Sequence, residues 1–245
     1  MIIRACIVIP MYNEEQIARQ SIKTVLVYVK QLPPEVRLVV VDDGSQDRTR
    51  ALLEECRVEE PDRLTLIFHQ RNKGYGAALR TGIAFAVHNG FEYVVFMDSD
   101  LTNHPKYLSN FYNRMLEGYD YIKASRYTSG AGVVGVPWHR RFISMLGNRV
   151  ARILFGLPLH DLTNGFRAVK TDILGKIELT ENGFAVIIEE LFLSKPLVRS
   201  YAEVPYVLTS RSEGQGKTHF TYDIKTYFTY LKYAIKSVSK RRPVV

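Results

Sequence analysis

Residues 94–103 read VVFMDSDLTN, in which four apolar residues lead directly into two carboxylates, Asp98 and Asp100. A short, strongly apolar run of this kind is typical of a strand buried on both faces of a sheet. In an open parallel sheet, ligands collect at the carboxyl ends of the strands, and the i, i+2 spacing places both carboxylates on one face if the chain stays extended. Two crowded carboxylates repel one another unless a cation lies near them. The stretch therefore indicates either a Mg²⁺ or Mn²⁺ site or a strand that ends in solvated turn residues.

Short apolar runs recur through the first hundred residues and alternate with segments of helical length. The runs are CIVIP (6–10), RLVVVDDGS (37–45), RLTLIFH (63–69) and YVVFMD (93–98). This alternation predicts an α/β fold, with a mostly parallel central sheet and helices on both of its faces. In the less regular second half we expect strands at 119–126 and 201–208 and helices near 141–155, 184–193 and 221–239. The chain of 245 residues suits one large α/β domain.

The formal charge of +8 is unevenly distributed along the chain. Residues 121–160 contain no Asp or Glu, but they include Lys123, Arg126, Arg140, Arg141, Arg149 and Arg152. A basic field of this kind suits phosphate groups, anionic lipid or nucleic acid. Because aromatic stacking motifs such as the RRM signature are missing, we predict no nucleic-acid partner.

The compartment follows from the cysteines and from the ends of the chain. Two cysteines without metal-type spacing make no disulfide framework, so we expect a cytoplasmic protein. The N-terminal apolar run is too short for a signal peptide, and no run approaches the ~20 residues that span a bilayer. The terminal segment 221–239 combines an apolar and aromatic stripe with interspersed lysines. Such a basic amphipathic helix is typical of a surface-lying membrane helix, but the stripe is equally consistent with packing on the domain.

A second strand also ends in acids, because Asp42 and Asp43 close the run at 37–45. A carboxylate at this point can accept hydrogen bonds from a ribose hydroxyl or a base N–H group, and Asp43 or Ser45 can instead cap the next helix. Two strands with acidic carboxyl ends favour a nucleotide site. Lys73, which follows the third run, is close enough along the chain to approach such a nucleotide.

Six segments, in this order, resemble glycosyltransferase family 2, and within it the polyprenyl-phosphate glycosyltransferases such as dolichyl-phosphate mannose synthase. They are IVIPMYNEE (7–15), VVVDDGSQDRT (39–49), NKGYGAALRTG (72–82), FMDSDLTN (96–103), DLTNGFRAVKTDIL (161–174) and EVPYVLTSRSEGQGKT (203–218). The resemblance covers roughly residues 5–235. It implies a GT-A fold, with a catalytic domain at 1–217 and a basic amphipathic helix and tail at 218–245 of the same domain. It also implies a nucleotide-sugar donor, Mg²⁺ or Mn²⁺ as cofactor and inversion at the sugar carbon.

On the donor side, the resemblance implies that Pro10, Tyr12 and Glu14 form a nucleotide-contacting loop. Asp42 and Asp43 then match the acids that read base and ribose, with Lys73 nearby. Asp98 matches the donor-side acid, and Asp100 matches the metal ligand. Many relatives carry Gln where Thr102 stands. A hydroxyl is a weaker metal ligand than an amide oxygen, so Thr102 or a water would complete the metal site.

On the acceptor side, the resemblance implies a lipid phosphate held by Arg126, Arg140 and Ser144. A phosphate monoester is already anionic near neutral pH and needs no strong general base. Arg211 and Lys217 match the residues that close over the donor diphosphate and sugar. For any one of these arginines alone, the alternative is a solvated surface charge.

Three further residues have open roles. Asp161 either orients the sugar or the arginine cluster, or serves as a turn or cap residue. Arg167 is a candidate ion-pair partner. Glu189 lies where family members carry an acid on a helix.

The sequence therefore predicts an inverting, metal-dependent transfer of a hexose from GDP-mannose or UDP-glucose to polyprenyl or dolichyl phosphate. We expect the enzyme at the cytoplasmic face of a membrane, attached through an interfacial segment or a membrane-anchored partner. One alternative is a family 2 enzyme with a saccharide or protein hydroxyl acceptor, which would need a carboxylate base. A second alternative is a non-catalytic protein that binds nucleotide sugars or nucleic acid.

Overall fold

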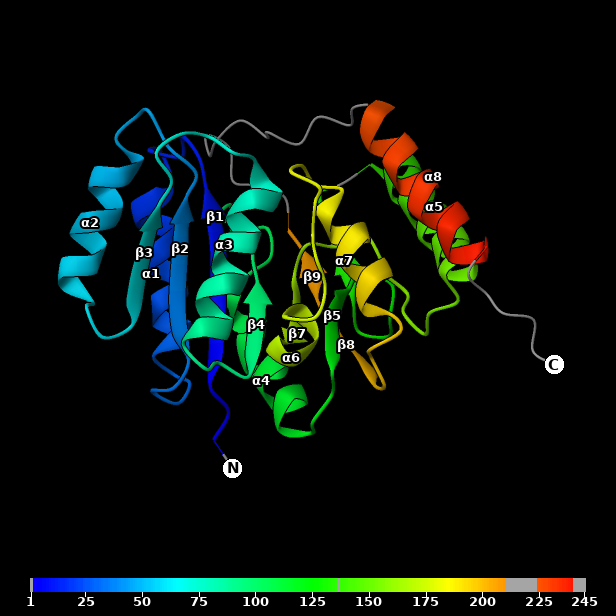
Figure 1. Ribbon diagram of the computed structural model, residues 1–245, viewed down its shortest axis with the longest axis horizontal. Helices are drawn as coiled ribbons and strands as arrows, with labels where there is room; N and C mark the ends of the chain where they lie inside the picture. The colour runs from blue at the N-terminus through cyan, green and yellow to red at the C-terminus, as the bar shows by residue number, and fades with distance from the viewer. Residues whose placement is uncertain (1, 136, 210–223, 240–245) are drawn as a thin grey trace.

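A seven-stranded sheet in the order β3-β2-β1-β4-β7-β5-β8 forms the centre of the computed structural model, which describes residues 2–135, 137–209 and 224–239 (Figure 1). The strands are β1 (Ala5–Met11), β2 (Arg37–Asp42), β3 (Leu64–Phe68), β4 (Tyr93–Phe96), β5 (Tyr121–Ser125), β7 (Arg167–Lys170) and β8 (Tyr201–Pro205). Of these, β7 is antiparallel to both of its neighbours, and every other pairing is parallel. The mostly parallel sheet predicted from the apolar runs is thus confirmed.

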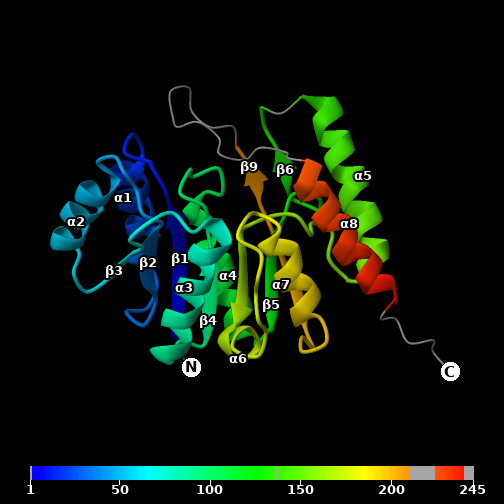
Figure 2. The ribbon, with the colours of Figure 1, turned by 45° about the horizontal axis from the view of Figure 1, so that its top comes forward.

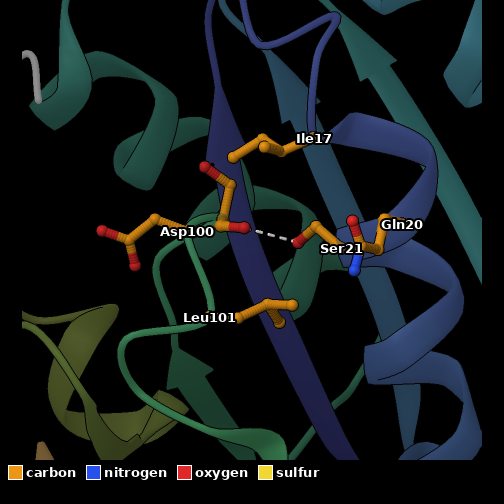
Figure 3. Close-up of a pocket in the computed structure, with 6 residues that line it drawn as sticks. Ile17, Gln20, Ser21, Asp100 and Leu101 are labelled. Atoms are coloured by element: carbon orange, nitrogen blue, oxygen red, sulfur yellow. Dashed lines mark hydrogen bonds between the residues drawn. The ribbon is translucent and has the colours of Figure 1, made fainter. Parts of the chain in front are cut away.

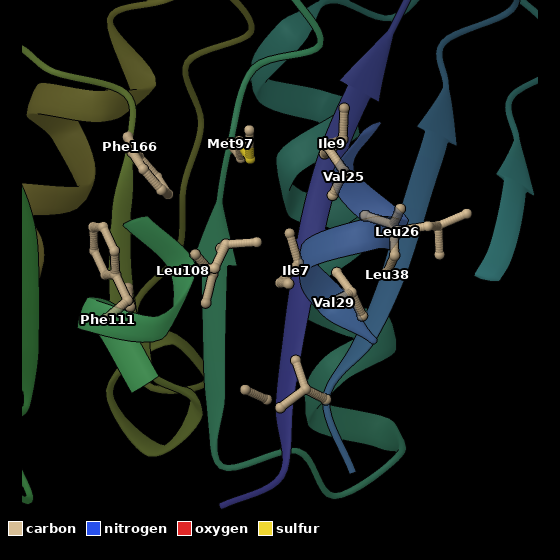
Figure 4. Close-up of a cluster of buried hydrophobic side chains, with 14 of the residues drawn as sticks. Ile7, Ile9, Val25, Leu26, Val29, Leu38, Met97, Leu108, Phe111 and Phe166 are labelled. Atoms are coloured by element: carbon tan, nitrogen blue, oxygen red, sulfur yellow. The ribbon is translucent and has the colours of Figure 1, made fainter. Parts of the chain in front are cut away.

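Helices cover both faces of the sheet, because its central strands are apolar on both sides. In β1, Ile7 and Ile9 face one hydrophobic cluster while Cys6 and Val8 face the other, and all four are fully buried. The first cluster includes side chains of α1 (Ala18–Val29), α2 (Thr49–Glu59) and α4 (Leu108–Leu116), part of which Figure 4 shows around Ile7. The second includes side chains of α3 (Tyr75–His88), α6 (Thr171–Leu174) and α7 (Val186–Ser194). A short 3-10 turn, η1 (Pro105–Tyr107), precedes α4.

Two long amphipathic helices lie side by side beyond the β8 edge of the sheet (Figures 1 and 2). They are α5 (Trp138–Phe155) and α8 (Ile224–Ser239), so both predicted amphipathic helices are confirmed where the structure describes them. Phe155 of α5 and Tyr233 of α8 belong to the second hydrophobic cluster, which fixes both helices on the domain. Within the described ranges, no helix combines the length and the apolar character needed to cross a bilayer.

The run at 201–208 forms two strands where the sequence suggested one. After Pro205 the chain leaves β5 and forms β9 (Val207–Leu208), which pairs with β6 (Gly132–Val133) in a separate small sheet. Proline has no N–H group to continue the ladder, which explains the break. No strand was predicted at β7, a four-residue element that begins and ends with a basic residue.

Candidate active site

The strand ends that carry the predicted acids lie at one edge of the sheet, the upper edge in Figure 1. The parallel strands β1, β2, β4 and β5 all end at this edge, and the antiparallel strand β7 begins there. The register places Phe96 and Lys123 on either side of Arg167, so the loops after β4 and β5 and the loop before β7 are neighbours. Pro10 is buried within β1, and Tyr12 and Glu14 lie in the loop that follows it.

The loops after β1 and β2 hold each other in place. The backbone N–H of Asn13 donates to Ser45 Oγ at 2.9 Å, and the N–H of Glu14 donates to Thr49 Oγ1 at 2.8 Å. Asp42 is buried and accepts hydrogen bonds from the backbone N–H and the hydroxyl of Ser45. Asp42 therefore holds the loop that, by resemblance, would face the nucleotide.

Asp43 is also buried, and its carboxylate holds the loop between β3 and α3. Oδ1 accepts from the N–H of Lys73 at 3.0 Å and lies 2.6 Å from His69 Nδ1, and Oδ2 accepts from the N–H of Gly74 at 2.7 Å. Gly74 has φ of +97°, and a Cβ there would lie 2.5 Å from the Asn182 carbonyl oxygen, so the loop requires glycine. Lys73, whose backbone is held in this loop, has an exposed side chain. Direct contact of Asp42 or Asp43 with a nucleotide stays a prediction.

The two acids of the opening stretch are each oriented by neighbouring hydroxyl or amide groups. Tyr75 donates its hydroxyl to Asp98 Oδ1 at 3.0 Å, and Asn103 Nδ2 lies 3.3 Å from Asp98 Oδ2. Burial and the adjacent Asp98 raise the pKa of Tyr75 well above its usual value, which keeps the phenol protonated as a donor. The backbone N–H and the hydroxyl of Thr102 both donate to Asp100 Oδ1, at 3.0 and 2.7 Å.

The turn that carries these acids is strained, since Leu101 has a φ of +57°, which a branched side chain rarely adopts. Figure 3 shows the shallow recess that Asp100 and Leu101 line together with Ile17, Gln20 and Ser21 of the α1 region. The carboxylate of Asp100 points away from Gln20 and Ser21 in this view. The recess is therefore a packing feature, and the Asp100 carboxylate is directed away from it.

The donor atoms around this turn fit a hard divalent cation. Asp98 and Asp100 supply carboxylate oxygens, and the buried amide oxygen of Asn103 has no hydrogen-bond partner among the described residues. Mg²⁺ and Mn²⁺ prefer such oxygen ligands and retain positions for water or phosphate. The described part of the chain contains no cluster of three or more His, Cys, Asp or Glu suited to a metal. A cation bound here would therefore need oxygens from its substrate or from water as well.

Arg126 and Asp161 form the second centre of the site. Arg126 Nε lies 2.6 Å from Asp161 Oδ2 and Nη2 lies 2.9 Å from Oδ1, and the Asp161 side chain is fully buried. Burial lowers the pKa of Arg126, but the charge and hydrogen bonds of Asp161 outweigh it and raise that pKa above its usual value. The following residue, Tyr127, donates its hydroxyl to Ser144 Oγ of α5 at 2.8 Å. Ser144 is therefore close to Arg126, and Arg140 lies one helical turn before Ser144 on α5.

The loop at residues 161–165 connects the two centres. Its first residue, Asp161, binds Arg126, and at its other end a Cβ on Gly165 would lie 3.1 Å from Asp98 Oδ2. The side chain of Lys123 donates to the Asn164 carbonyl at 2.8 Å, and Arg167 Nη1 donates to the Gly165 carbonyl at 2.7 Å. The acid pair after β4 and the arginine after β5 thus share a loop that is held from inside the protein.

Comparison with known proteins agrees with this arrangement. The family model described as glycosyl transferase family 2 matches residues 6–178. The chain belongs to glycosyl transferase family 2. A polyprenol monophosphomannose synthase of Mycolicibacterium smegmatis is 33% identical over 217 residues, which is 87% of this chain and 80% of the relative. An undecaprenyl-phosphate mannosyltransferase of Micrococcus luteus is 31% identical over 221 residues, which is 87% of each.

Solved structures of lower identity share the fold. Glucosyl-3-phosphoglycerate synthase of Mycobacterium tuberculosis, in complex with Mn²⁺, UDP and its product, aligns with a TM-score of 0.64 at 20% identity over 96% of this chain and 78% of that one. The same enzyme with Mg²⁺ and UDP aligns with a TM-score of 0.65 at 19% identity, over 98% and 80%. The predicted GT-A fold and the predicted glycosyltransferase activity are confirmed by these matches.

Two residues with open roles are buried in this glycosyltransferase. Arg167 forms a fully buried ion pair with Glu190, with Nε donating to Oε1 at 2.8 Å. Glu189 instead accepts hydrogen bonds from the N–H groups of Thr180 and Glu181 and from the Tyr233 hydroxyl. Through these hydrogen bonds Glu189 holds the backbone at Thr180 and Glu181 close to α8.

Several residues that support the candidate site were not assigned to it from the sequence. They are Tyr75, Lys123, Asn148, Asn164 and Glu190. Asn148 of α5, for example, accepts from the N–H of Leu162 at 2.8 Å and so supports the 161–165 loop. The sequence signal available for such residues was a polar side chain within a mostly apolar segment. The predicted residues Arg211 and Lys217 lie outside the described residues.

Proposed function

We propose that this enzyme transfers a hexose, with inversion, from a nucleoside diphosphate sugar to a polyprenyl phosphate. The observation that carries the proposal is the 161–165 loop, which joins an acid pair suited to a cation with an arginine suited to a phosphate. Both relatives named above are polyprenyl-phosphate mannosyltransferases by name, which favours mannose as the sugar. GDP-mannose is therefore the first donor to test and UDP-glucose the second.

Asp98 and Asp100 are the residues that would hold Mg²⁺ or Mn²⁺, which when bound supplies positive charge to the leaving diphosphate. Tyr75 and Thr102 fix these carboxylates from within the protein through their hydroxyl groups. The donor nucleotide would lie along the loops after β1 and β2, which are held together by mutual hydrogen bonds within the protein. The site is in this respect preorganised.

The acceptor phosphate would bind at Arg126 and Ser144, with Arg140 one turn along α5. A phosphate oxygen then forms the new bond to the anomeric carbon while the bond to the diphosphate oxygen breaks. The nucleoside diphosphate leaves with the bonding electrons, and no proton has to be removed from the acceptor. Asp161 neutralises Arg126 and fixes the direction of its guanidinium group.

A hydroxyl acceptor is less compatible with this geometry, because it requires a carboxylate to remove its proton. The carboxylate nearest to Arg126 is Asp161, and both of its oxygens already accept hydrogen bonds from the guanidinium. With both oxygens engaged in this way, the carboxylate is not placed to take a proton from a hydroxyl acceptor.

A transfer assay tests the proposal. Purified enzyme would be given GDP-mannose or UDP-glucose, with and without Mn²⁺, and either a polyprenyl phosphate or a free saccharide. We expect one donor to yield a sugar phosphate lipid only when metal and lipid phosphate are both present. Equal transfer to free saccharide, or metal-independent transfer, would contradict the proposal.

The lipid acceptor also implies a location, and we propose peripheral attachment at the cytoplasmic face of a membrane. The acid-free stretch from 121 to 160 and the lysines of α8 support this attachment, because anionic headgroups attract both. A membrane-anchored partner protein is the alternative means of attachment.

A further inference from the structure

Helix α5 carries a stripe of large apolar side chains that faces solvent. We call it the α5 stripe: Trp138, Phe142, Leu146, Val150 and Ile153, spaced by four, four, four and three residues. This spacing places all five on one side of an α-helix about 27 Å long. Trp138 is 79% exposed and the other four are also exposed. Leu231, Ile235 and Val238 of the neighbouring α8 are exposed as well.

The opposite side of α5 is the one that packs on the protein. Asn148 and Phe155 are buried, and Ser144 bonds to Tyr127. An amphipathic helix of a globular protein normally turns its apolar side inward, so this helix has the reverse arrangement. Large contiguous apolar patches of this kind mark binding surfaces for proteins or membranes.

The charges beside the stripe favour a bilayer as the occupant. Arg141 and Arg149 are exposed on α5, and Lys232 and Lys236 are exposed on α8. No acid lies between residues 121 and 160 to oppose the two arginines, whereas Lys232 lies 3.5 Å from the carboxylate of Glu181. A helix with an apolar side, an aromatic residue and flanking basic residues suits the headgroup region of anionic lipid.

The stripe and the candidate acceptor site lie on opposite sides of the same helix. Ser144 lies on the inner side of α5, bonded to the residue that follows Arg126, while the stripe occupies the outer side. A lipid whose phosphate reaches Arg126 would thus have its apolar tail next to a helix that already lies in the lipid.

We propose that the α5 stripe inserts into the surface of an anionic phospholipid bilayer, with the outer side of α8 beside it. Sequence reasoning assigned this role to the terminal helix alone, but Tyr233 and Ala234 of α8 are buried against the domain. The α5 helix therefore provides the principal lipid contact. The biological reason for this contact rests on the proposed function, but its physical test does not.

The test uses Trp138, which is the only tryptophan in the chain. The full chain would be mixed with vesicles of phosphatidylglycerol or of phosphatidylcholine, neither containing polyprenyl phosphate. We expect a blue shift of the fluorescence and co-sedimentation with phosphatidylglycerol vesicles, both weakened by salt. Phosphatidylcholine vesicles should give a much smaller response.

Paired variants identify the surface. Phe142→Ser combined with Leu146→Ser should weaken vesicle binding at least ~tenfold, because two large apolar side chains no longer leave water. The matched control is Val27→Ser combined with Val58→Ser, which alters residues exposed on α1 and α2 and should leave binding unchanged. All four positions are exposed, so both proteins should fold, and circular dichroism would check this.

Three results would overturn the proposal: no response to anionic vesicles, equal binding by both double variants, or a protein dimer that the Phe142→Ser and Leu146→Ser variant disperses. Transfer to a detergent-dispersed, short-chain prenyl phosphate separates this inference from the proposed function. Loss of vesicle binding with that transfer intact would support the membrane role of the stripe. Vesicle binding without any transfer would contradict the proposed function alone.

Discussion

The guanidinium group of Arg126 faces the carboxylate of Asp161 side-on, with Nε 2.6 Å from Oδ2 and Nη2 2.9 Å from Oδ1. Asp161 is fully buried and the Arg126 side chain is only 17% exposed. The pair fixes one end of the 161–165 loop, and at the other end a Cβ on Gly165 would lie 3.1 Å from Asp98 Oδ2. The loop therefore runs from the Arg126–Asp161 pair to the acid pair after β4.

Replacing Asp161 by Asn should destabilise the protein, because it leaves the Arg126 charge largely buried without its partner. Removing one member of a buried ion pair typically costs about 3 kcal/mol or more in the free energy of unfolding. Urea denaturation at neutral pH would measure the loss. The matched control is Glu117→Gln, which breaks an exposed pair with Arg114 and should cause no measurable change. Equal effects of the two substitutions would contradict a structural role for the Arg126–Asp161 pair.

Lys123 predicts a pH-dependent stability. Burial, assisted by the charge of Arg167, lowers its pKa to about 7, whereas the unfolded chain should titrate near ~10.4. Between these values the unfolded state binds more protons, so the free energy of unfolding rises with pH. The destabilisation caused by burying the charged lysine has its full size below about pH 7. It decreases as the pH increases toward the pKa of the lysine in the unfolded chain. The free energy of unfolding of the wild type should therefore increase with pH relative to that of Lys123→Met, by up to ~1.4 kcal/mol per pH unit in this window.

Urea denaturation at several pH values between 6.5 and 9.5 would measure this difference. Lys106→Met is the control, because Lys106 is exposed and should give a profile parallel to wild type. A Lys123→Met profile that also runs parallel to wild type would show that Lys123 does not titrate in this range.

Gly165→Ala should disturb the acid pair without unfolding the protein. The added Cβ would lie 3.1 Å from Asp98 Oδ2, so the Asp98 carboxylate must shift by a few tenths of an ångström, whereas 3.5 Å from the Tyr75 hydroxyl oxygen is an ordinary contact. We expect Mn²⁺ binding, followed by electron paramagnetic resonance, to weaken about tenfold, equivalent to ~1.4 kcal/mol. Gly147→Ala is the control, since its Cβ meets nothing within 4 Å. Unchanged Mn²⁺ affinity in Gly165→Ala would place the cation away from Asp98.

Asp100→Asn should abolish metal-dependent transfer while the fold survives. The Asn side chain keeps an oxygen that can accept from Thr102, but the charge that would hold a cation is lost. Loss of turnover of at least ~100-fold is expected, with a thermal unfolding curve close to that of wild type. Nearly normal turnover would instead support a non-catalytic role for this acid.

Much of the fold was predictable, because three of the four apolar runs of the first half form buried strands, the fourth forms the partly buried edge strand β3, and helices alternate with them. Strand β7 was not, since its first residue, Arg167, becomes a core residue only by pairing with Glu190 on a distant helix. Single-sequence patterns cannot indicate such a partner 23 residues away.

The acidic residues of the candidate site were predictable from the sequence, but the residues that hold the site in place were less so. Asp98, Asp100 and Arg126 meet at one sheet edge because strand ends do so in parallel sheets. The role of Asp161 stayed open until its distance to Arg126 was known. The supporting roles of Lys123 and Asn164 could not be assigned from the sequence, because they depend on a carbonyl group that only the folded loop presents.

The central claim is that Arg126, held by Asp161, binds the acceptor phosphate, whereas the acid pair Asp98 and Asp100 acts on the donor. Steady-state kinetics of Arg126→Ala with a nucleotide sugar and polyprenyl phosphate test it most directly. We predict that KM for the lipid phosphate rises at least ~tenfold, as expected for a lost charge-assisted hydrogen bond. The KM for the donor should stay close to the wild-type value. An equal rise in both constants, or a rise confined to the donor, would contradict the account.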